Sequence, residues 1–495
     1  MRILASDVIG WYRPKKCGLR VYLRHHQEPE PESGIFEQML NRLGLRHEMQ
    51  HLESLGPFTD LTDCAYEDRF LRTKQCLLER QAIIYQGAFS ATVQLDGISC
   101  TVVGYPDFLI RKGNGYSIQD AKLALRIENH WEISLQLQIY GWLYEKNIGT
   151  APVSVQVYSG TGKLVEIPYP GETAVLEILG QIARIKALPA EPYEPVGVSK
   201  CTGCSFHDRC WEKAEKNNDV SLLMNVDQHL ARALRAEGVH THRDLLSRFD
   251  ETSLAEFKRP AGDRSQKVGK AAAKILMHAN LLENKTERIL SPHQIPEVPN
   301  YVMFDLEGLP PHLNEMDRIY LWGMQVFGTE PGSFMPAVTG FGPDGDQQGW
   351  EDFLRLAKAI FDRYGDIPFV HWAPYERTYI NRYIDRFRDR DAVANRVLRN
   401  LLDLYTIVPE CIALPVPSYS LKVIEKYVGF ERTQDTYGGS WAMALFIEAT
   451  ETVDETVRQA IMDKILKYNE EDLAATWAVF QWFRKRVPAA KAGVP

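Results

Sequence analysis

Residues 104–123 read GYPDFLIRKGNGYSIQDAKL, two apolar runs separated by a polar turn sequence. The Asn114-Gly115 pair between these runs predicts a β-hairpin. Asp107 stands before the first run, and Asp120 ends the second. Because side chains alternate along a strand with period two, Asp120 and Lys122 are expected to point the same way. The hairpin should therefore bring two carboxylates and a lysine to one edge of a sheet.

These three side chains suit metal-dependent phosphodiester cleavage. Hydrolysis near neutral pH needs a metal ion that polarises the phosphoryl oxygen and acidifies a water molecule. Mg²⁺ and Mn²⁺ prefer carboxylate oxygens as ligands. Lys122 would position the water or stabilise the developing charge. The pattern Asp-x-Lys also occurs by chance, and taken alone it fits a surface strand with paired charges better than a site.

Further candidate residues lie on both sides of the hairpin. A helix predicted from about residue 128 to 145 carries Gln136 and Tyr140 four residues apart, and hence on one face. His47 lies in NRLGLRHEMQHLESL, a predicted N-terminal helix, and its imidazole could add a metal ligand. Strands mixed with helices make this region α/β.

Four cysteines frame this region. Cys17 stands alone near the N-terminus, and Cys201, Cys204 and Cys210 follow a C-x₂-C-x₅-C pattern. Clustered cysteines in a reducing compartment more often bind metal than each other. Four thiolates suit either Zn²⁺ or a [4Fe–4S] cluster, and His207 offers an alternative ligand.

In order and spacing these residues resemble the RecB-like branch of the PD-(D/E)XK nucleases, and more narrowly its iron–sulfur members. The resemblance covers roughly residues 5 to 215. It implies a restriction-endonuclease-like fold in which a divalent metal is held by His47, Asp107 and Asp120. Its other implied residues are catalytic Lys122, Gln136 and Tyr140, and the ligands of a structural [4Fe–4S] cluster, Cys17, Cys201, Cys204 and Cys210. Glu48 is an alternative to its neighbour His47.

A second acidic pattern begins in YVMFDLEGL at residues 301–309. Asp305 and Glu307 lie two apart on this predicted strand and therefore share a face. Far downstream, Tyr468 and Asp472 lie four apart, at the predicted start of a helix. One more carboxylate would complete a set of four carboxylate ligands around two metal ions. The candidates for it are Glu376 and Asp403.

This second pattern resembles the ribonuclease H-like DEDD exonucleases of the tyrosine-bearing subgroup, over residues 300 to about 486. The resemblance implies that Asp305, Glu307 and Asp472 bind metal and that Tyr468 orients the water. The family's middle motif usually ends in Phe-Asp, whereas Tyr375-Glu376 occupies that place here. Glu376 is therefore the catalytic candidate of this motif. The alternative is a degenerate domain that binds nucleic acid without cleaving it.

The whole order resembles a family of RecB-like nucleases that fuse these two modules. We expect an α/β multidomain chain with a PD-(D/E)XK domain at 1–215, a helical linker at 216–292 that loosely resembles a helix-hairpin-helix, and a ribonuclease H-like domain at 300–486. The sequence contains no G-x-x-x-x-G-K-[ST] motif, so ATP hydrolysis is not expected.

Composition sets limits on location and partners. The 495 residues are 45% hydrophobic and 25% charged, with a net charge of −8. A nucleic-acid binder of this charge must concentrate its positive groups locally. No signal peptide stands at the N-terminus, and no apolar run approaches the roughly 18 residues that span a bilayer. A cytoplasmic protein without a membrane partner is expected.

The combined hypothesis is a Mg²⁺- or Mn²⁺-dependent nuclease acting on DNA, single-stranded or with frayed ends, in repair, recombination or defence. Nucleic acid is the expected partner, and a separate helicase is a candidate second one. Two alternatives remain: an RNA-processing exonuclease driven by the C-terminal domain, and a non-catalytic nucleic-acid-binding adaptor for a separate helicase.

Overall fold

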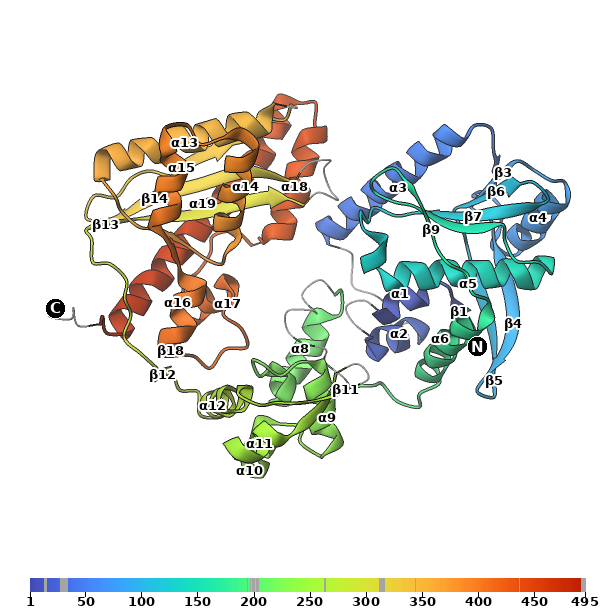
Figure 1. Cartoon of the computed structure of the whole chain (residues 1–495), viewed down its shortest axis with the longest axis horizontal. Helices are drawn as coiled ribbons and strands as arrows, with labels where there is room; N and C mark the ends of the chain where they lie inside the picture. The colour runs from blue at the N-terminus through green and yellow to red at the C-terminus, as the bar shows by residue number, and fades with distance from the viewer. Residues whose placement is uncertain are drawn as a thin grey trace. The chain divides into compact units, whose positions relative to one another are not determined.

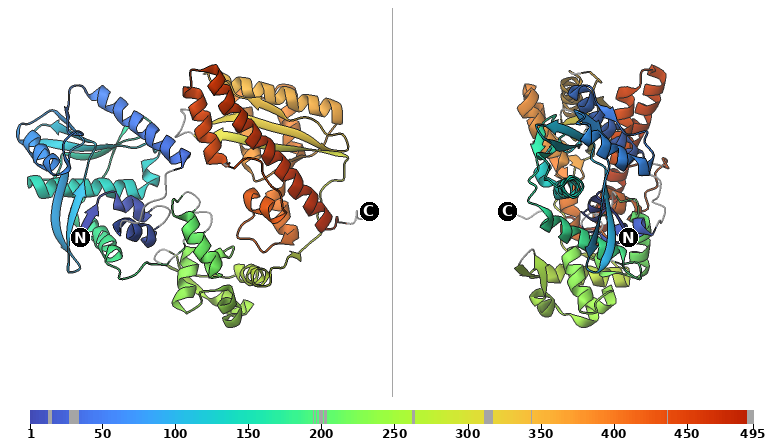
Figure 2. Two further views of the ribbon diagram at one scale, coloured as in Figure 1. Left: turned by 180° about the vertical axis from the view of Figure 1, so that it is seen from behind. Right: turned by 90° about the vertical axis from the view of Figure 1, so that its right-hand side faces the viewer.

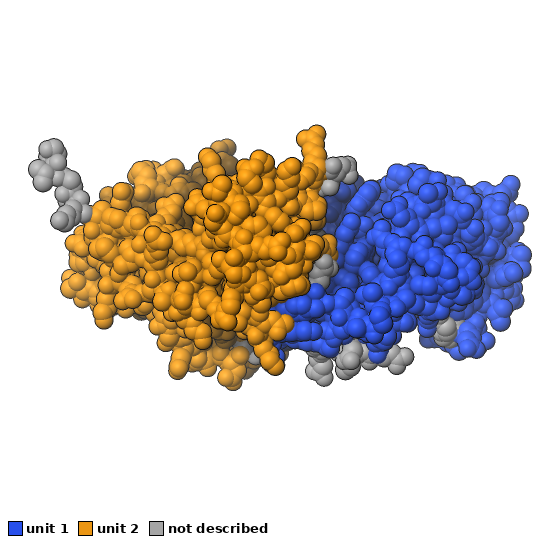
Figure 3. All heavy atoms as spheres, turned by 90° about the horizontal axis from the view of Figure 1, so that it is seen from below, with its two compact units in different colours: residues 1–214 blue, residues 215–495 orange. Residues whose placement is uncertain are grey.

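The chain forms two compact units, Met1–Ala214 and Glu215–Pro495 (Figures 1 and 3). The computed structural model describes residues 1–12, 16–26, 34–193, 195, 197, 201, 204–261, 264–310, 317–342, 344–435 and 437–490. Among these residues, no helix is both long and apolar enough to cross a bilayer.

The first unit is built around a six-stranded mixed sheet. Its strands lie in the order β2 (Thr59–Asp60), β3 (Ile83–Tyr85), β6 (Phe108–Lys112), β7 (Gly115–Ala121), β8 (Ser154–Tyr158) and β9 (Leu164–Glu166). The predicted hairpin is β6–β7 and is confirmed, with Lys112 opposite Gly115. Its two-residue turn is Gly113-Asn114, one position earlier than expected, because Gly113 adopts the left-handed backbone that such turns require (φ 59°).

A helical crossover joins β7 to β8. The two strands are parallel, and the chain between them contains η1 (Ile127–Asn129) and α5 (Trp131–Ile148), which packs against the sheet. The α5 helix also contacts a second, three-stranded sheet made of β1 (Arg2–Leu4), β5 (Ile98–Gly104) and β4 (Phe89–Leu95). The core of the first unit therefore surrounds α5.

Short and long helices complete the first unit. They are α1 (Asp7–Tyr12), α2 (Gly18–His25), α3 (Ile35–Leu55), α4 (Tyr66–Leu78), α6 (Glu172–Lys186) and α8 (His207–Lys216), of which α8 runs across the boundary. The α3 helix contacts β7, the strand that carries Asp120.

The second unit begins with a helical region that has a core of its own, including Leu234, Leu254 and Ile275. Its elements are η2 (Val220–Leu222), α9 (Gln228–Ala236), α10 (His242–Arg248), α11 (Glu251–Glu256), β10 (Lys258–Ala261), β11 (Arg264–Lys267) and α12 (Ala271–Asn284). The α9 and α10 helices flank a turn at Glu237-Gly238. Thr241 starts α10 with a capping box to Asp244.

The rest of the second unit is a five-stranded sheet with helices on both faces (Figure 2). Its order is β15 (Met335–Val338), β14 (Arg318–Gly328), β13 (Asn300–Leu309), β16 (Phe369–His371) and β17 (Leu401–Asp403). The first three strands are antiparallel, and β16 and β17 run parallel to β13. A short ladder outside this sheet pairs β12 (Arg288–Ile289) with β18 (Ile412–Ala413).

Strand β13 divides its side chains between the two faces. Val302 and Phe304 pack with α13 (Gly345–Tyr364) and α14 (Tyr375–Phe387) in one core. Tyr301 and Met303 pack in another core with α19 (Glu455–Arg486). By period-two alternation, Asp305 and Glu307 continue the row that faces α19. The remaining helices are η3 (Arg390–Ala392), α15 (Val393–Asn400), α16 (Leu404–Cys411), α17 (Leu421–Tyr427) and α18 (Gly439–Glu451).

The C-terminal helix corrects one expectation. Tyr468 and Asp472 were predicted at a helix start, but α19 begins at Glu455, and both lie in the middle of its 32 residues. Glu471, the neighbour of Asp472 on α19, is buried and accepts a 2.9 Å hydrogen bond from the backbone N–H of Thr433. The start at Glu455 is set by Asp454, whose carboxylate caps the first turn.

Close approach of α19 to the sheet depends on Gly323 in β14. An added Cβ there would lie 1.7 Å from Oδ1 of Asn469. We predict that Gly323→Ala lowers the free energy of unfolding by about 1–3 kcal/mol, because the buried Asn469 side chain must move away and lose its hydrogen bond to Asp305, or the helix that carries it must shift. Denaturant titration monitored by tryptophan fluorescence measures this. The matched control is Gly439→Ala at the first position of α18, where nothing lies within 4 Å of the new methyl group. Equal stability of both variants would contradict the prediction.

Candidate functional site

The sheet of the first unit brings Asp107, Asp120 and Lys122 together. Asp107 lies at the entry to β6, and its Oδ2 accepts a 2.9 Å hydrogen bond from the backbone N–H of Ala121 at the end of β7. Asp120 lies in β7, and its carboxylate is paired with the ammonium of Lys122. The backbone N–H of Lys122 is fixed by a 2.9 Å bond to the carbonyl of Tyr158 in β8.

Burial and like charge shape the electrostatics of this edge. Burial, and then the neighbouring charge of Asp120, raise the pKa of Asp107 well above its ordinary value. Burial opposes the charge on Lys122, but the carboxylates of Asp120 and Asp107 raise its pKa overall. When both carboxyls are ionised, Asp107 and Asp120 carry one negative charge more than Lys122 offsets, which favours a bound cation.

The N-terminal helix α3 presents Glu48, rather than His47, to these carboxylates. Gln86 bridges the two acids, donating from Nε2 to Glu48 at 2.7 Å and to Asp107 at 3.0 Å. Tyr85 donates a second bond to Glu48 at 2.8 Å. The His47 ring instead stacks on Tyr158 with centroids 4.7 Å apart. The sequence predicted His47 at this position, with Glu48 as the alternative. Helical periodicity alone does not determine which of two adjacent residues faces the sheet.

Gln136 and Tyr140 lie together on α5, as their spacing predicts. Gln136 donates a 2.9 Å hydrogen bond to the Tyr140 hydroxyl. Burial, and then the charges of Asp120 and Asp107, raise the pKa of Tyr140, so it stays protonated beside the carboxylates. Gly104 permits this approach, because a Cβ there would lie 2.8 Å from the Tyr140 ring.

The four cysteines of the predicted cluster converge on one pocket. Cys17 precedes α2, Cys210 lies in α8, and all four line the pocket together with Phe206 and His207. Burial raises the pKa of Cys17, and burial with the three neighbouring thiols raises that of Cys210 to about 12. Two thiols that resist ionisation beside two others fit a site in which a cationic group neutralises them. His207 is also hydrogen-bonded to Asp208 at 2.9 Å.

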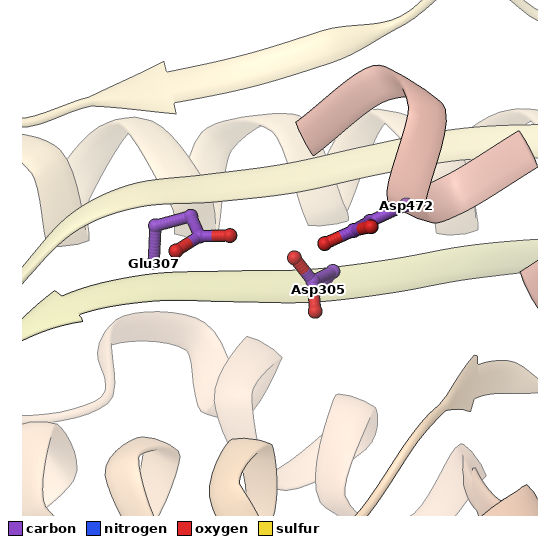
Figure 4. A group of neighbouring side chains, drawn as sticks. All are labelled: Asp305, Glu307 and Asp472. Carbon is purple, nitrogen blue, oxygen red and sulfur yellow. The ribbon is translucent and has the colours of Figure 1, made fainter. Parts of the chain in front are cut away.

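The second unit gathers Asp305, Glu307 and Asp472 (Figure 4). Two come from β13 and one from α19, and their ligand atoms lie within 4.8 Å of one another. In the part of the chain that the structure describes, this is the one acidic, histidine or cysteine group with that spacing. The donor set, three carboxylates, suits a hard divalent ion.

The surroundings disfavour negative charge on the side chains of this triad. Burial, and then the charge of Asp472, raise the pKa of Glu307 to about 8. Burial and Glu307 raise that of Asp305 well above its ordinary range. Asn469, one turn before Asp472 on α19, donates a 2.7 Å hydrogen bond to Asp305. Protonation or a bound cation would relieve this repulsion.

The other predicted residues of this site have partners of their own. Glu376 is buried at the start of α14, and its carboxylate lies 2.9 Å from Nδ1 of His371. Asp403 accepts a 3.0 Å bond from the backbone N–H of Ala373, which has a left-handed backbone (φ 88°). Tyr468 is buried, and burial with the charge of Glu307 raises its pKa.

Two cations at this site were missed from the sequence. The ammonium of Lys422 lies 2.5 Å from Asp472, and Arg432 contacts the same carboxylate oxygen. Lys422 lies in the first turn of α17, and Arg432 follows that helix in irregular chain. No spacing rule links either residue to Asp472, because the pairing depends on how α17 packs against α19.

Comparisons with known proteins cover both sites. One family model, the PD-(D/E)XK nuclease superfamily, matches residues 20–211, and another, the RNase_H superfamily, matches residues 302–484. A search of curated proteins finds no match. Among solved structures, the crystal structure of SSO0001 aligns at 14% identity over 42% of this chain and 85% of its own, with a TM-score of 0.26. The predicted fused architecture is confirmed: the chain carries a PD-(D/E)XK nuclease superfamily domain followed by an RNase H superfamily domain, and is a metal-dependent phosphodiester hydrolase.

Proposed function

We propose that the N-terminal site cleaves DNA, with a preference for single strands or frayed ends. The observation that supports this most is the arrangement of Asp107 and Asp120 around Lys122 at the edge of the sheet. Lysine paired to a metal-binding carboxylate is suited to orient a water and to stabilise the charge that develops on the phosphoryl oxygens. Repair, recombination or defence is the setting in which such ends arise, and a separate helicase would supply single strands.

In this proposal Mg²⁺ or Mn²⁺ is held by Glu48, Asp107 and Asp120. The ion would polarise the phosphoryl oxygen and acidify the attacking water. Glu48 takes the place first given to His47, because Glu48 is linked to Asp107 through Gln86. Lys122 stays protonated beside Asp120. Tyr140 also keeps its proton and can donate a hydrogen bond to an oxygen of the substrate.

We further propose that Cys17, Cys201, Cys204 and Cys210 hold a [4Fe–4S] cluster with a structural role. Cys17 starts the segment that leads into α2, and the other three lie at the end of the first unit. A cluster on these thiolates would tie the two ends of the nuclease domain together. Zn²⁺ is the competing occupant, since the same donors suit it.

A second candidate function is exonuclease action by the C-terminal site, on RNA or DNA. The close spacing of Asp305, Glu307 and Asp472 favours it, since their ligand atoms lie within 4.8 Å of one another. Tyr468 would orient the water in this site. Glu376 would complete the ligand set after leaving His371, to which it is bonded at 2.9 Å.

The two sites are separable by mutation. We predict that Asp120→Asn and Lys122→Ala each lower Mn²⁺-dependent cleavage of single-stranded DNA about a hundredfold or more. Asp120→Asn removes the charge of a metal ligand, and Lys122→Ala removes the ammonium that stabilises the transition state. Gel assays of a labelled oligonucleotide measure this, and EDTA should stop cleavage in the wild type. Full activity in both variants, with loss in Asp305→Asn and a preference for RNA, would assign the activity to the second unit. No cleavage with any metal would favour the adaptor.

Variants of two neighbouring residues on α3 test whether Glu48 is the third carboxylate that binds the metal. We predict that Glu48→Gln lowers Mn²⁺ affinity or DNA cleavage by about tenfold to a hundredfold. His47→Gln is the matched control, one residue away, and should change either by less than about threefold. Isothermal titration in the Asp305→Asn background measures the affinity. The opposite ranking would return the ligand role to His47.

The cluster has a direct spectroscopic test. Anaerobically purified protein should be brown, absorb at about 400 nm and contain about four irons per chain. Cys17→Ser should lose most of this iron and lower the thermal stability of the protein. Cys411→Ser is the matched control, because Cys411 lies in the second unit and is outside the pocket. A colourless protein with one zinc would replace the cluster with a zinc site.

A further inference from the structure

Two cations engage one oxygen of a carboxylate that belongs to the metal-binding triad. The ammonium of Lys422 lies 2.5 Å from Oδ1 of Asp472, and Nη2 of Arg432 donates to the same oxygen. A carboxylate that binds a divalent ion does not ordinarily need two further cations. Their presence therefore calls for a role other than pairing with Asp472.

Arg432 is held rigidly and has one donor to spare. Its side chain is 3% exposed and makes a fork with Glu425, at 2.8 Å from Nε and 2.6 Å from Nη2. Its Nη1 is buried and has no hydrogen-bond partner among the described residues. An unsatisfied buried donor on a charged group is costly, so a site that retains one is suited to an incoming acceptor.

Two tyrosine rings hold the cations in place. The ammonium of Lys422 lies 4.7 Å from the Tyr468 ring centroid and 5.2 Å from that of Tyr437. The guanidinium of Arg432 lies 5.7 Å and 4.7 Å from the same two rings. Such cation–π contacts favour charge at a fixed point. Because Tyr468 is the proposed water-orienting residue, this point lies beside the reacting atoms.

The negative charges of the carboxylates around the triad can be balanced by Lys422, Arg432 and bound metal. When ionised, Asp305, Glu307 and Asp472 with Glu376 and Glu425 carry five negative charges, of which Lys422 and Arg432 offset two. Bound divalent metal would offset the remainder. A phosphodiester would then bring one more negative charge, with non-bridging oxygens that accept from ammonium and guanidinium groups.

We propose that Lys422 and Arg432 form a phosphate-binding pair for the C-terminal site. Lys422, whose side chain is 33% exposed, exchanges its contact with Asp472 for one non-bridging oxygen of the nucleic-acid phosphodiester. Arg432 stays on Glu425 and donates through Nη1 to the same phosphate. The inference rests on the proposed metal-dependent function of this site and names the residues that bind its substrate.

The test separates metal binding from substrate binding in the full-length chain, in an Asp107→Asn/Asp120→Asn background. Lys422→Met should raise Mn²⁺ affinity about tenfold, because a cation leaves Asp472. It should also reduce the salt slope of single-stranded oligonucleotide binding in EDTA by about 0.7, the loss of one phosphate contact. Electron paramagnetic resonance measures free Mn²⁺, and fluorescence anisotropy measures the oligonucleotide.

The matched control is Lys358→Met, which removes the same charge from an exposed pair with Asp362 on α13. It should change neither quantity. A purely structural role for Lys422 would instead weaken Mn²⁺ binding and leave the salt slope unchanged, and that result would overturn the proposal. Absence of any Mn²⁺ binding in the background protein would contradict the proposed function of the site itself, which keeps the two failures distinct.

Discussion

Both sites of this protein depend on carboxylates held close together where water is largely excluded. Half-buried Asp107 lies beside buried Asp120 in the first unit, and half-buried Asp305 lies beside buried Glu307 and Asp472 in the second. Such groups repel one another, and burial penalises their charges further. The fold must therefore supply the energy that keeps them in place, and a cation stabilises them when it binds.

In both units, period-two alternation along a β-strand brings charged side chains to the same face of the strand. At the end of β7 it directs Asp120, and Lys122 just beyond the strand, to one side. In β13 it places Asp305 and Glu307 on the face toward α19. The opposite face of β13 is filled by Val302 and Phe304, which pack in a helix-covered core. The strands thus serve the site and the core at once.

The two sites neutralise their carboxylates differently. In the first unit a single lysine from the same strand end pairs with Asp120. In the second unit Lys422 and Arg432 come from chain outside the sheet, and Arg432 is fixed by Glu425 and two tyrosine rings. A local pair follows from strand geometry, whereas the distant pair needs helix packing. This difference explains why Lys122 could be identified from the sequence and Lys422 could not.

The sequence by itself determined the hairpin, the α/β class and the strand that carries Asp305 and Glu307, and it predicted most of the residues that the structure brings together around the two groups of carboxylates. These features depend on local rules: turn chemistry, the alternation of strands and the spacing of helices. Tertiary structure alone decided that Glu48 faces Asp107, that Asp472 lies in the middle of a long helix, and that two cations meet it. Those outcomes depend on the rotation of α3 and on the packing of α17 and α19. Contacts of that kind join residues with no fixed separation in sequence, so no local pattern encodes them.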